Sequence, residues 1–224
     1  MRTVPLNVSM EDQQRIRPLW DDFLSIDTMF KEFDDEISLK VLKAGLPRLG
    51  EVASAAWKKA RASAPDDDPV WDEKYLKSYL AWRAAGFLSL AVQYGLASCV
   101  NFLLDAGANV NYHFPPIWRS SYGYPPLQDA VQYKRADMAM LLINRGADWK
   151  FLDGGRLFAV TLGHSLLFWG MYSNNIDLVK FMLEKGVPIY KESNYLTAYI
   201  EALAQGYYEV IALVDAAEGR QLLN

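Results

Sequence analysis

The chain has 224 residues, of which 51% are hydrophobic and 22% are charged, and its mean hydropathy is −0.06. A chain of this length and balance can bury a sizeable core, which excludes a wholly disordered protein. The formal net charge is −4, the pI is near 5.3 and no block of basic residues is present, so we expect no nucleic-acid-binding surface.

The N-terminal residues and the apolar runs argue against export and against a membrane span. Residues 1–20 lack the apolar core of a secretory signal peptide. The longest apolar-rich run, residues 157–172, is shorter than the roughly 18 residues of a membrane span and contains polar residues. Cys99 is the only cysteine, which excludes an intrachain disulfide and fits a reducing compartment. We expect a cytoplasmic protein, or one delivered into a host cytosol, with no membrane span.

Residues 1–85 are predicted to form a helical N-terminal cap region. Apolar residues recur at helical spacing, and a polar breaker interrupts them at residues 65–69. We expect helices over residues 10–23, 27–44, 49–64 and 70–85. The region is either a degenerate pair of the repeats that follow or a distinct small domain, and the sequence leaves both open.

Two acidic runs in this region, residues 33–36 and 66–68, lack the alternating ligands and the turn glycine of a calcium loop. We therefore expect a solvated face or a helix-capping loop at each run. Docking of a basic partner is the alternative, since residues 1–80 carry 15 acidic and 12 basic residues.

Four later segments share one pattern, and the letters AVQY begin at the same place in the first two of them. Each has a large apolar residue, a small residue three positions later, a turn, and a second apolar helix ended in three cases by a glycine. The small residues are Ala91, Ala130, Gly170 and Ala202, the turn residues are Gly95, Lys134, Asn174 and Gly206, and the terminal glycines are Gly107, Gly146 and Gly186. The pattern predicts stacked helix–turn–helix units over residues 86–111, 124–149, 164–189 and 196–219.

These segments resemble ankyrin repeats. Pro126, Leu127 and Ala130 match the Pro-Leu-His-x-Ala core of that family, with Gln128 in place of the histidine. The run Leu103-Leu104-x-x-Gly107-Ala108-Asn109 is similar to the end of the family's second helix and its turn. The resemblance covers about residues 86–219 and weakens toward the last unit. It implies an all-α ankyrin-repeat solenoid in residues 86–224, preceded by the helical N-terminal cap of residues 1–85.

The repeat departs from the family in its length. Its terminal glycines are 39 and 40 residues apart, whereas the family period is about 33. We expect the six and seven extra residues to lie in loops on one face of the solenoid, often the binding face.

The residues that carry chemistry form no coherent site in the sequence. His113 and His164 are the only histidines and fall in different loops, so we predict no metal site. Cys99 has neither a nearby base nor an electropositive setting, and we expect an inert thiol. The glycines at 154, 155 and 163 do not satisfy a phosphate-loop pattern. We predict no catalytic residues and no cofactor, and hence a protein that is not an enzyme.

A partner-binding surface is predicted where the first helices end and in the two junction loops. The resemblance implies that residues before the first turn of each unit face a concave groove, and exposed aromatic and arginine side chains are typical of binding hot spots. The candidates are Gln93, Tyr94, Gln132, Tyr133 and Tyr172 at the helix ends, and His113, Phe114, Trp118, Arg119, Tyr122, Trp149, Phe151 and Arg156 in the loops. Local packing of the loop rings, and stacking of the tyrosines between repeats, are the alternatives.

We therefore predict a non-catalytic module that binds a protein partner, with a basic partner as one alternative and a monomer favoured. A bacterial or host-directed adaptor or effector fits this module. So does an immunity or inhibitor protein that neutralises a cognate toxin or enzyme. A third alternative is a targeting subunit of an enzyme with no recognisable motif. The step from the resemblance to protein binding is an analogy at the level of the fold.

Overall fold

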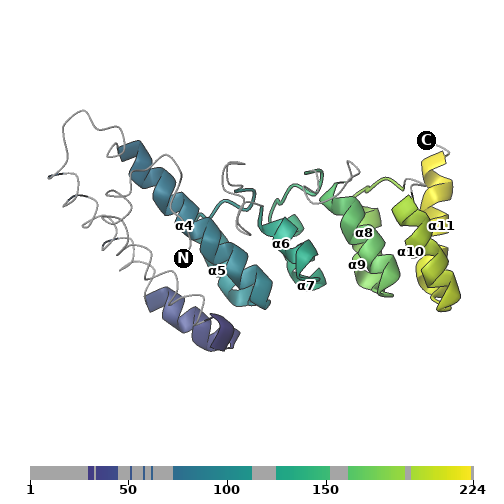
Figure 1. Ribbon diagram of the computed structural model, residues 1–224, viewed down its shortest axis with the longest axis horizontal. Coiled ribbons are helices and arrows are strands. Elements are labelled where there is room, and N and C mark those ends of the chain that lie inside the picture. The colour runs from purple at the N-terminus through teal and green to yellow at the C-terminus, as the bar shows by residue number, and fades with distance from the viewer. Residues whose placement is uncertain are drawn as a thin grey trace. The chain divides into compact units, whose positions relative to one another are not determined.

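The computed structural model describes residues 30–32, 34–44, 73–112, 125–151, 161–189 and 193–222, together with residues 51, 58 and 62 (Figure 1). All regular elements in these residues are helices, which confirms the all-α class. The chain divides into two compact units, Met1–Asp129 and Ala130–Asn224. The predicted helix over 10–23 lies outside the described residues, and only three residues of the predicted helix over 49–64 are described.

The first unit contains a helix over residues 35–44, then α4 (Glu73–Tyr94) and α5 (Ala97–Asp105). The 22 residues of α4 run without interruption across position 85, so the last predicted cap helix and the first helix of the first repeat are one element. Residues 85–92 in its C-terminal half are buried, and α4 packs against α5. The division between the two compact units falls after Asp129.

The second unit contains α7 (Ala136–Asn144), α8 (Leu162–Tyr172), α9 (Ile176–Glu184), α10 (Ser193–Ala204) and α11 (Tyr208–Leu222). The preceding helix, α6 (Pro126–Gln132), crosses the division between the units. First helices contact first helices, as α8 contacts α10, and second helices contact second helices, as α9 contacts α7 and α11. Figure 1 shows the pairs α8–α9 and α10–α11 side by side. Each pair therefore buries its apolar face against the next.

The turn after each first helix has the same hydrogen bonds in all four units. Its turn residue adopts a left-handed conformation, with φ of 74° at Gly95, 54° at Lys134, 55° at Asn174 and 74° at Gly206. The next N–H then donates to the carbonyl of the predicted small residue, in the helix-ending pattern known as a Schellman motif. These bonds are Leu96 to Ala91 (2.9 Å), Arg135 to Ala130 (2.8 Å), Asn175 to Gly170 (2.8 Å) and Tyr207 to Ala202 (2.9 Å). The predicted equivalence of the four positions is confirmed.

The second helices end in the same way at the predicted glycines. Gly107, Gly146 and Gly186 have φ of 94°, 92° and 79°, a region that side chains disfavour and glycine does not. The following N–H returns to the carbonyl five residues earlier in each case, at 2.9 to 3.2 Å. The C-cap function predicted for these glycines is therefore correct.

The start of α8 differs from the sequence-based expectation. Thr161 is its N-cap, and its hydroxyl and the His164 side chain close a reciprocal capping box. Measured from the small residue, α8 begins four residues earlier than α6, which begins at Pro126. Extra residues of this junction therefore lengthen a helix. Ser165 lies buried inside α8.

Candidate partner-binding site

In the second compact unit (Ala130–Asn224), the predicted binding residues at the ends of α6 and α8 lie at the surface. Gln132 is exposed, and Tyr133 and Tyr172 expose 47% and 57% of their area. Each side chain adjoins a turn closed by the hydrogen bonds described above, so its backbone is fixed before any partner arrives. A fixed aromatic side chain loses little conformational entropy on binding, which makes it a suitable anchor.

In the first unit, the equivalent residues of the other AVQY segment are half-buried. The Nε2 atom of Gln93 donates to Oδ1 of Asp129 at 3.3 Å, and Tyr94 is also only partly exposed. Gln93 and Tyr94 are thus less exposed than Gln132 and Tyr133. Gln93 contributes to the interior of the first compact unit, because its amide is hydrogen-bonded to the buried carboxylate of Asp129.

Asp129 is the most perturbed carboxylate among the described residues. It is 1% exposed in the first turns of α6, and burial raises its pKa to about 7, against the opposing effect of hydrogen bonds with Ser89 and Gln93. Its Oδ2 atom is buried without a hydrogen-bond partner among the described residues. Sequence reasoning missed this residue. The only signal in the sequence was a carboxylate directly before the small buried residue Ala130, at a position that faces α4.

The loop candidates divide between local packing and residues that are not described. Trp149 is half-buried against the start of α8, where its carbonyl accepts the Gly163 N–H at 2.9 Å. A Cβ atom at Gly163 would lie 2.6 Å from Cε3 of Trp149, so only glycine fits under this ring. Phe151 is also half-buried, and its carbonyl accepts the Leu162 N–H at 2.9 Å. The remaining loop candidates lie outside the described residues: His113, Phe114, Trp118, Arg119, Tyr122 and Arg156.

The described histidine, His164, and the cysteine, Cys99, are both buried. His164 is 5% exposed, and its Nδ1 atom lies 2.8 Å from the Thr161 hydroxyl in the capping box. Cys99 is fully buried, and burial, with a smaller contribution from Asp35, raises its pKa to about 12. A thiol in this state is a poor nucleophile at neutral pH. The described residues contain no group of three or more His, Cys, Asp or Glu side chains that could hold a metal ion.

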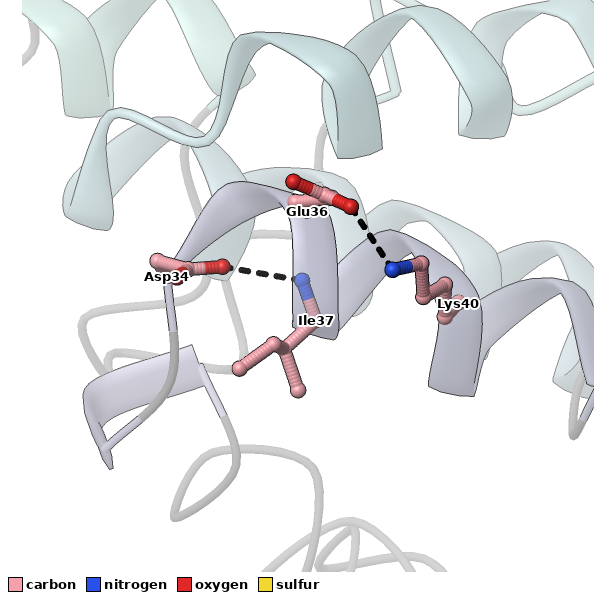
Figure 2. A network of polar contacts seen from close by, with 4 residues as sticks. All are labelled: Asp34, Glu36, Ile37 and Lys40. Carbon is pink, nitrogen blue, oxygen red and sulfur yellow. Dashed lines mark hydrogen bonds and ion pairs between the residues drawn. The ribbon is translucent and has the colours of Figure 1, made fainter.

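The acidic run at residues 33–36 caps two helices. Asp34 begins the helix over 35–44, where its Oδ1 accepts the Ile37 N–H at 2.9 Å, and Glu36 pairs with Lys40 one turn later (Figure 2). These contacts confirm the helix-capping interpretation for this run. The other run, at residues 66–68, lies outside the described residues.

The next residue of the run, Asp35, caps a helix that is distant in sequence. Its carboxylate accepts the N–H groups of Ser98 and Cys99, at 2.8 and 3.1 Å, in the first turn of α5. The residue before α5, Leu96, offers no capping side chain, so Asp35 supplies the missing acceptor. Burial acts to raise the pKa of Asp35, but the hydrogen bonds outweigh it and leave the pKa below its ordinary value.

Comparison with known proteins agrees with this geometry over one segment. The ankyrin repeat family model matches residues 88–113, which hold the end of α4, all of α5 and its terminal turn. No curated protein matches the chain. No helix in the described part is both long and apolar enough to cross a membrane. Residues 88–113 of this chain are therefore similar to an ankyrin repeat.

Proposed function

We propose that the chain is a non-catalytic module that binds a protein partner through the ends of its first helices. Ankyrin repeats generally mediate protein–protein interactions, and a matched repeat at residues 88–113 is consistent with such a module. The observation that carries the proposal is the exposure of Tyr133 and Tyr172 on rigid, hydrogen-bonded helix ends. Aromatic side chains of this kind dominate the affinity of many interfaces.

The proposal includes an ankyrin solenoid with the N-terminal region as its cap. The repeated turn geometry of the four units supports a solenoid, as do the contacts between successive pairs in the second unit. The hydrogen bonds of Asp35 to the first turn of α5 support a cap, because they join the helix over 35–44 to the matched repeat. In this arrangement the groove lies along the first helices, and the junction loops border it.

A quantitative capture experiment tests the binding surface. The full chain and its Tyr133→Ala/Tyr172→Ala variant are immobilised, and proteins retained from native cell extract are quantified by mass spectrometry. We expect the partner's recovery to fall on the order of 10-fold or more, since each anchor contributes roughly 1–2 kcal/mol. The matched control is Tyr208→Ala, which removes a 72% exposed tyrosine from the start of a second helix.

The circular dichroism spectra of the wild type, the double variant and the Tyr208→Ala control should be the same, because the substituted side chains lie at the surface. Equal recovery of every retained protein by the wild type and the double variant would refute the proposed surface. Equal loss in the Tyr208→Ala control would show that tyrosine content, and not position, determines retention.

The cellular role follows from the partner's identity. The acidic net charge of −4 supports a basic partner, because opposite charges accelerate association. A cytoplasmic adaptor or host-directed effector is the first role that we propose, and an immunity protein for a basic toxin is the second. Rescue of growth by co-expression with a toxin from a neighbouring gene would select the second role over the first. A captured enzyme complex would select a targeting subunit.

A further inference from the structure

An apolar stripe runs along the exposed side of α10. Leu196, Ile200 and Leu203 expose 45%, 62% and 45% of their area, and their spacing places them on one helical face. The opposite side of α10 is buried in the second unit through Tyr195, Ala198 and Ala202. Three large apolar side chains in a row on an exposed helical face form a candidate contact surface.

The equivalent stripe of α8 is covered by a helix. Counted from the small residues Gly170 and Ala202, the three stripe positions correspond to His164, Phe168 and Met171. These side chains are 5%, 9% and 0% exposed. The cover is α10, whose Tyr195 ring lies 6.3 Å from the ring of Phe168. The α10 stripe therefore has the position and spacing of a face that, one unit earlier, receives a helix.

The charge around the stripe defines the chemistry of that helix. Residues 193–222 contain one basic residue, Arg220, against the carboxylates of Glu201, Glu209, Asp215 and Glu218. Glu209 is paired with Lys180 of α9 at 3.2 Å. Asp215 is exposed and accepts a hydrogen bond from the Tyr199 hydroxyl at 2.9 Å. With four carboxylates and one arginine, the α10–α11 pair thus has a negative edge that includes the exposed Asp215.

We propose that the α10 stripe binds an amphipathic helix of a protein partner, with an apolar face flanked by lysine or arginine. The helical form follows from the covered stripe of α8, and the basic flanks follow from the carboxylates of α11. A second copy of this chain is the weaker occupant, because it would bring two acidic edges together. The inference does not rest on the function proposed for Tyr133 and Tyr172.

A displayed library of random peptides, each about four helical turns long, is selected for binding. The sequences of the retained peptides show which ligand the protein prefers. The bait is the full chain. Selected peptides are then titrated against Leu196→Ser/Ile200→Ser/Leu203→Ser and against a matched control, Ile37→Ser/Val41→Ser. The control removes two side chains that are 42% and 46% exposed on the helix over 35–44.

We expect a class of peptides with apolar residues at helical spacing and flanking lysine or arginine. These peptides should bind the wild type and the control equally, and the stripe variant at least about 10-fold more weakly, because hot-spot contacts are lost. Asp215→Asn should weaken them several-fold, and added salt should weaken them further, since the edge is exposed. Circular dichroism checks that the stripe variant is folded.

Two results would overturn the inference. One is a selection in which no peptide depends on the stripe, or in which the stripe-dependent peptides are acidic or lack helical spacing. The other is sedimentation of the wild type as a dimer that the stripe variant converts to a monomer, which would assign the face to a second copy. Because Tyr133 and Tyr172 are unchanged in the stripe variant, capture through those residues should persist whichever result is obtained.

Discussion

Replacing Asp129 by asparagine tests the energetic cost of a buried carboxylate in the first unit. The wild-type side chain is 1% exposed, and burial raises its pKa from 3.8 to about 7. Asparagine has nearly the same shape and keeps an oxygen for the Gln93 amide, but it carries no charge to desolvate. The substitution therefore removes the cost of ionisation while preserving the hydrogen bond of 3.3 Å.

The sign of the effect follows from proton binding. The folded state holds its Asp129 proton more tightly than the unfolded chain, so its contribution to stability is complete below pH 4 and is lost as the pH rises through 7. A shift from 3.8 to about 7 corresponds to a loss of about 4 kcal/mol across that window. From pH 5 to pH 8, the part of the window accessible without acid unfolding, we expect a loss of about 3 kcal/mol.

Urea unfolding followed by circular dichroism at pH 5, 6, 7 and 8 measures this difference. Asp129→Asn should be more stable than the wild type at pH 8, by about 2–4 kcal/mol, and should lose less stability between pH 5 and 8. The control is Asp137→Asn, an exposed carboxylate in the first turn of α7, which should change stability by a few tenths of a kcal/mol at every pH. Wild-type stability that is flat or rising from pH 5 to 8 would refute the reasoning.

Two further substitutions probe single contacts. Gly170→Ala should destabilise the second unit by roughly 1–2 kcal/mol in thermal or urea unfolding, because its Cβ would lie 2.9 Å from Val179 of α9. Gly219→Ala in α11 meets nothing within 4 Å and should be neutral or stabilise by up to about 1 kcal/mol; equal effects would contradict the close approach. Asp35→Ala should cost about 1–2 kcal/mol and speed labelling of native Cys99 by a thiol reagent on the order of 10-fold, through easier opening of α5. An unchanged labelling rate would show that the Asp35 cap does not govern access to this thiol.

The turns could be predicted from the sequence because their causes are local. A residue with positive φ, a small residue four positions before it and a period of apolar side chains all lie within one unit. Lys134 and Asn174 hold the same left-handed conformation as Gly95 and Gly206. Because these two residues are not glycines, their turns were located by aligning the four repeated segments and not by residue type. The terminal glycines were predicted for the same reason.

Contacts between distant segments could not be predicted in this way. Asp35 and α5 are more than 60 residues apart, and nothing in the acidic run specifies which helix it caps. The continuity of α4 was missed because the change from an aromatic to an aliphatic pattern near residue 85 resembles a boundary. The earlier start of α8 depends on the Thr161–His164 box, which lies upstream of the position equivalent to the start of α6.

The two AVQY segments show why identical local sequence gives different surfaces, and they make this difference measurable. Gln93 donates to the buried Asp129, whereas Gln132 is exposed, and the residue equivalent to Asp129 in the next unit is Trp169, which has no carboxylate. Gln93→Ala should therefore cost about 1–2 kcal/mol at pH 8, where Asp129 is charged, and less at pH 5. Gln132→Ala should change stability by a few tenths of a kcal/mol at both pH values. Equal losses of stability for Gln93→Ala and Gln132→Ala in urea unfolding would contradict this explanation. They would show that the hydrogen bond to Asp129 does not distinguish the two residues.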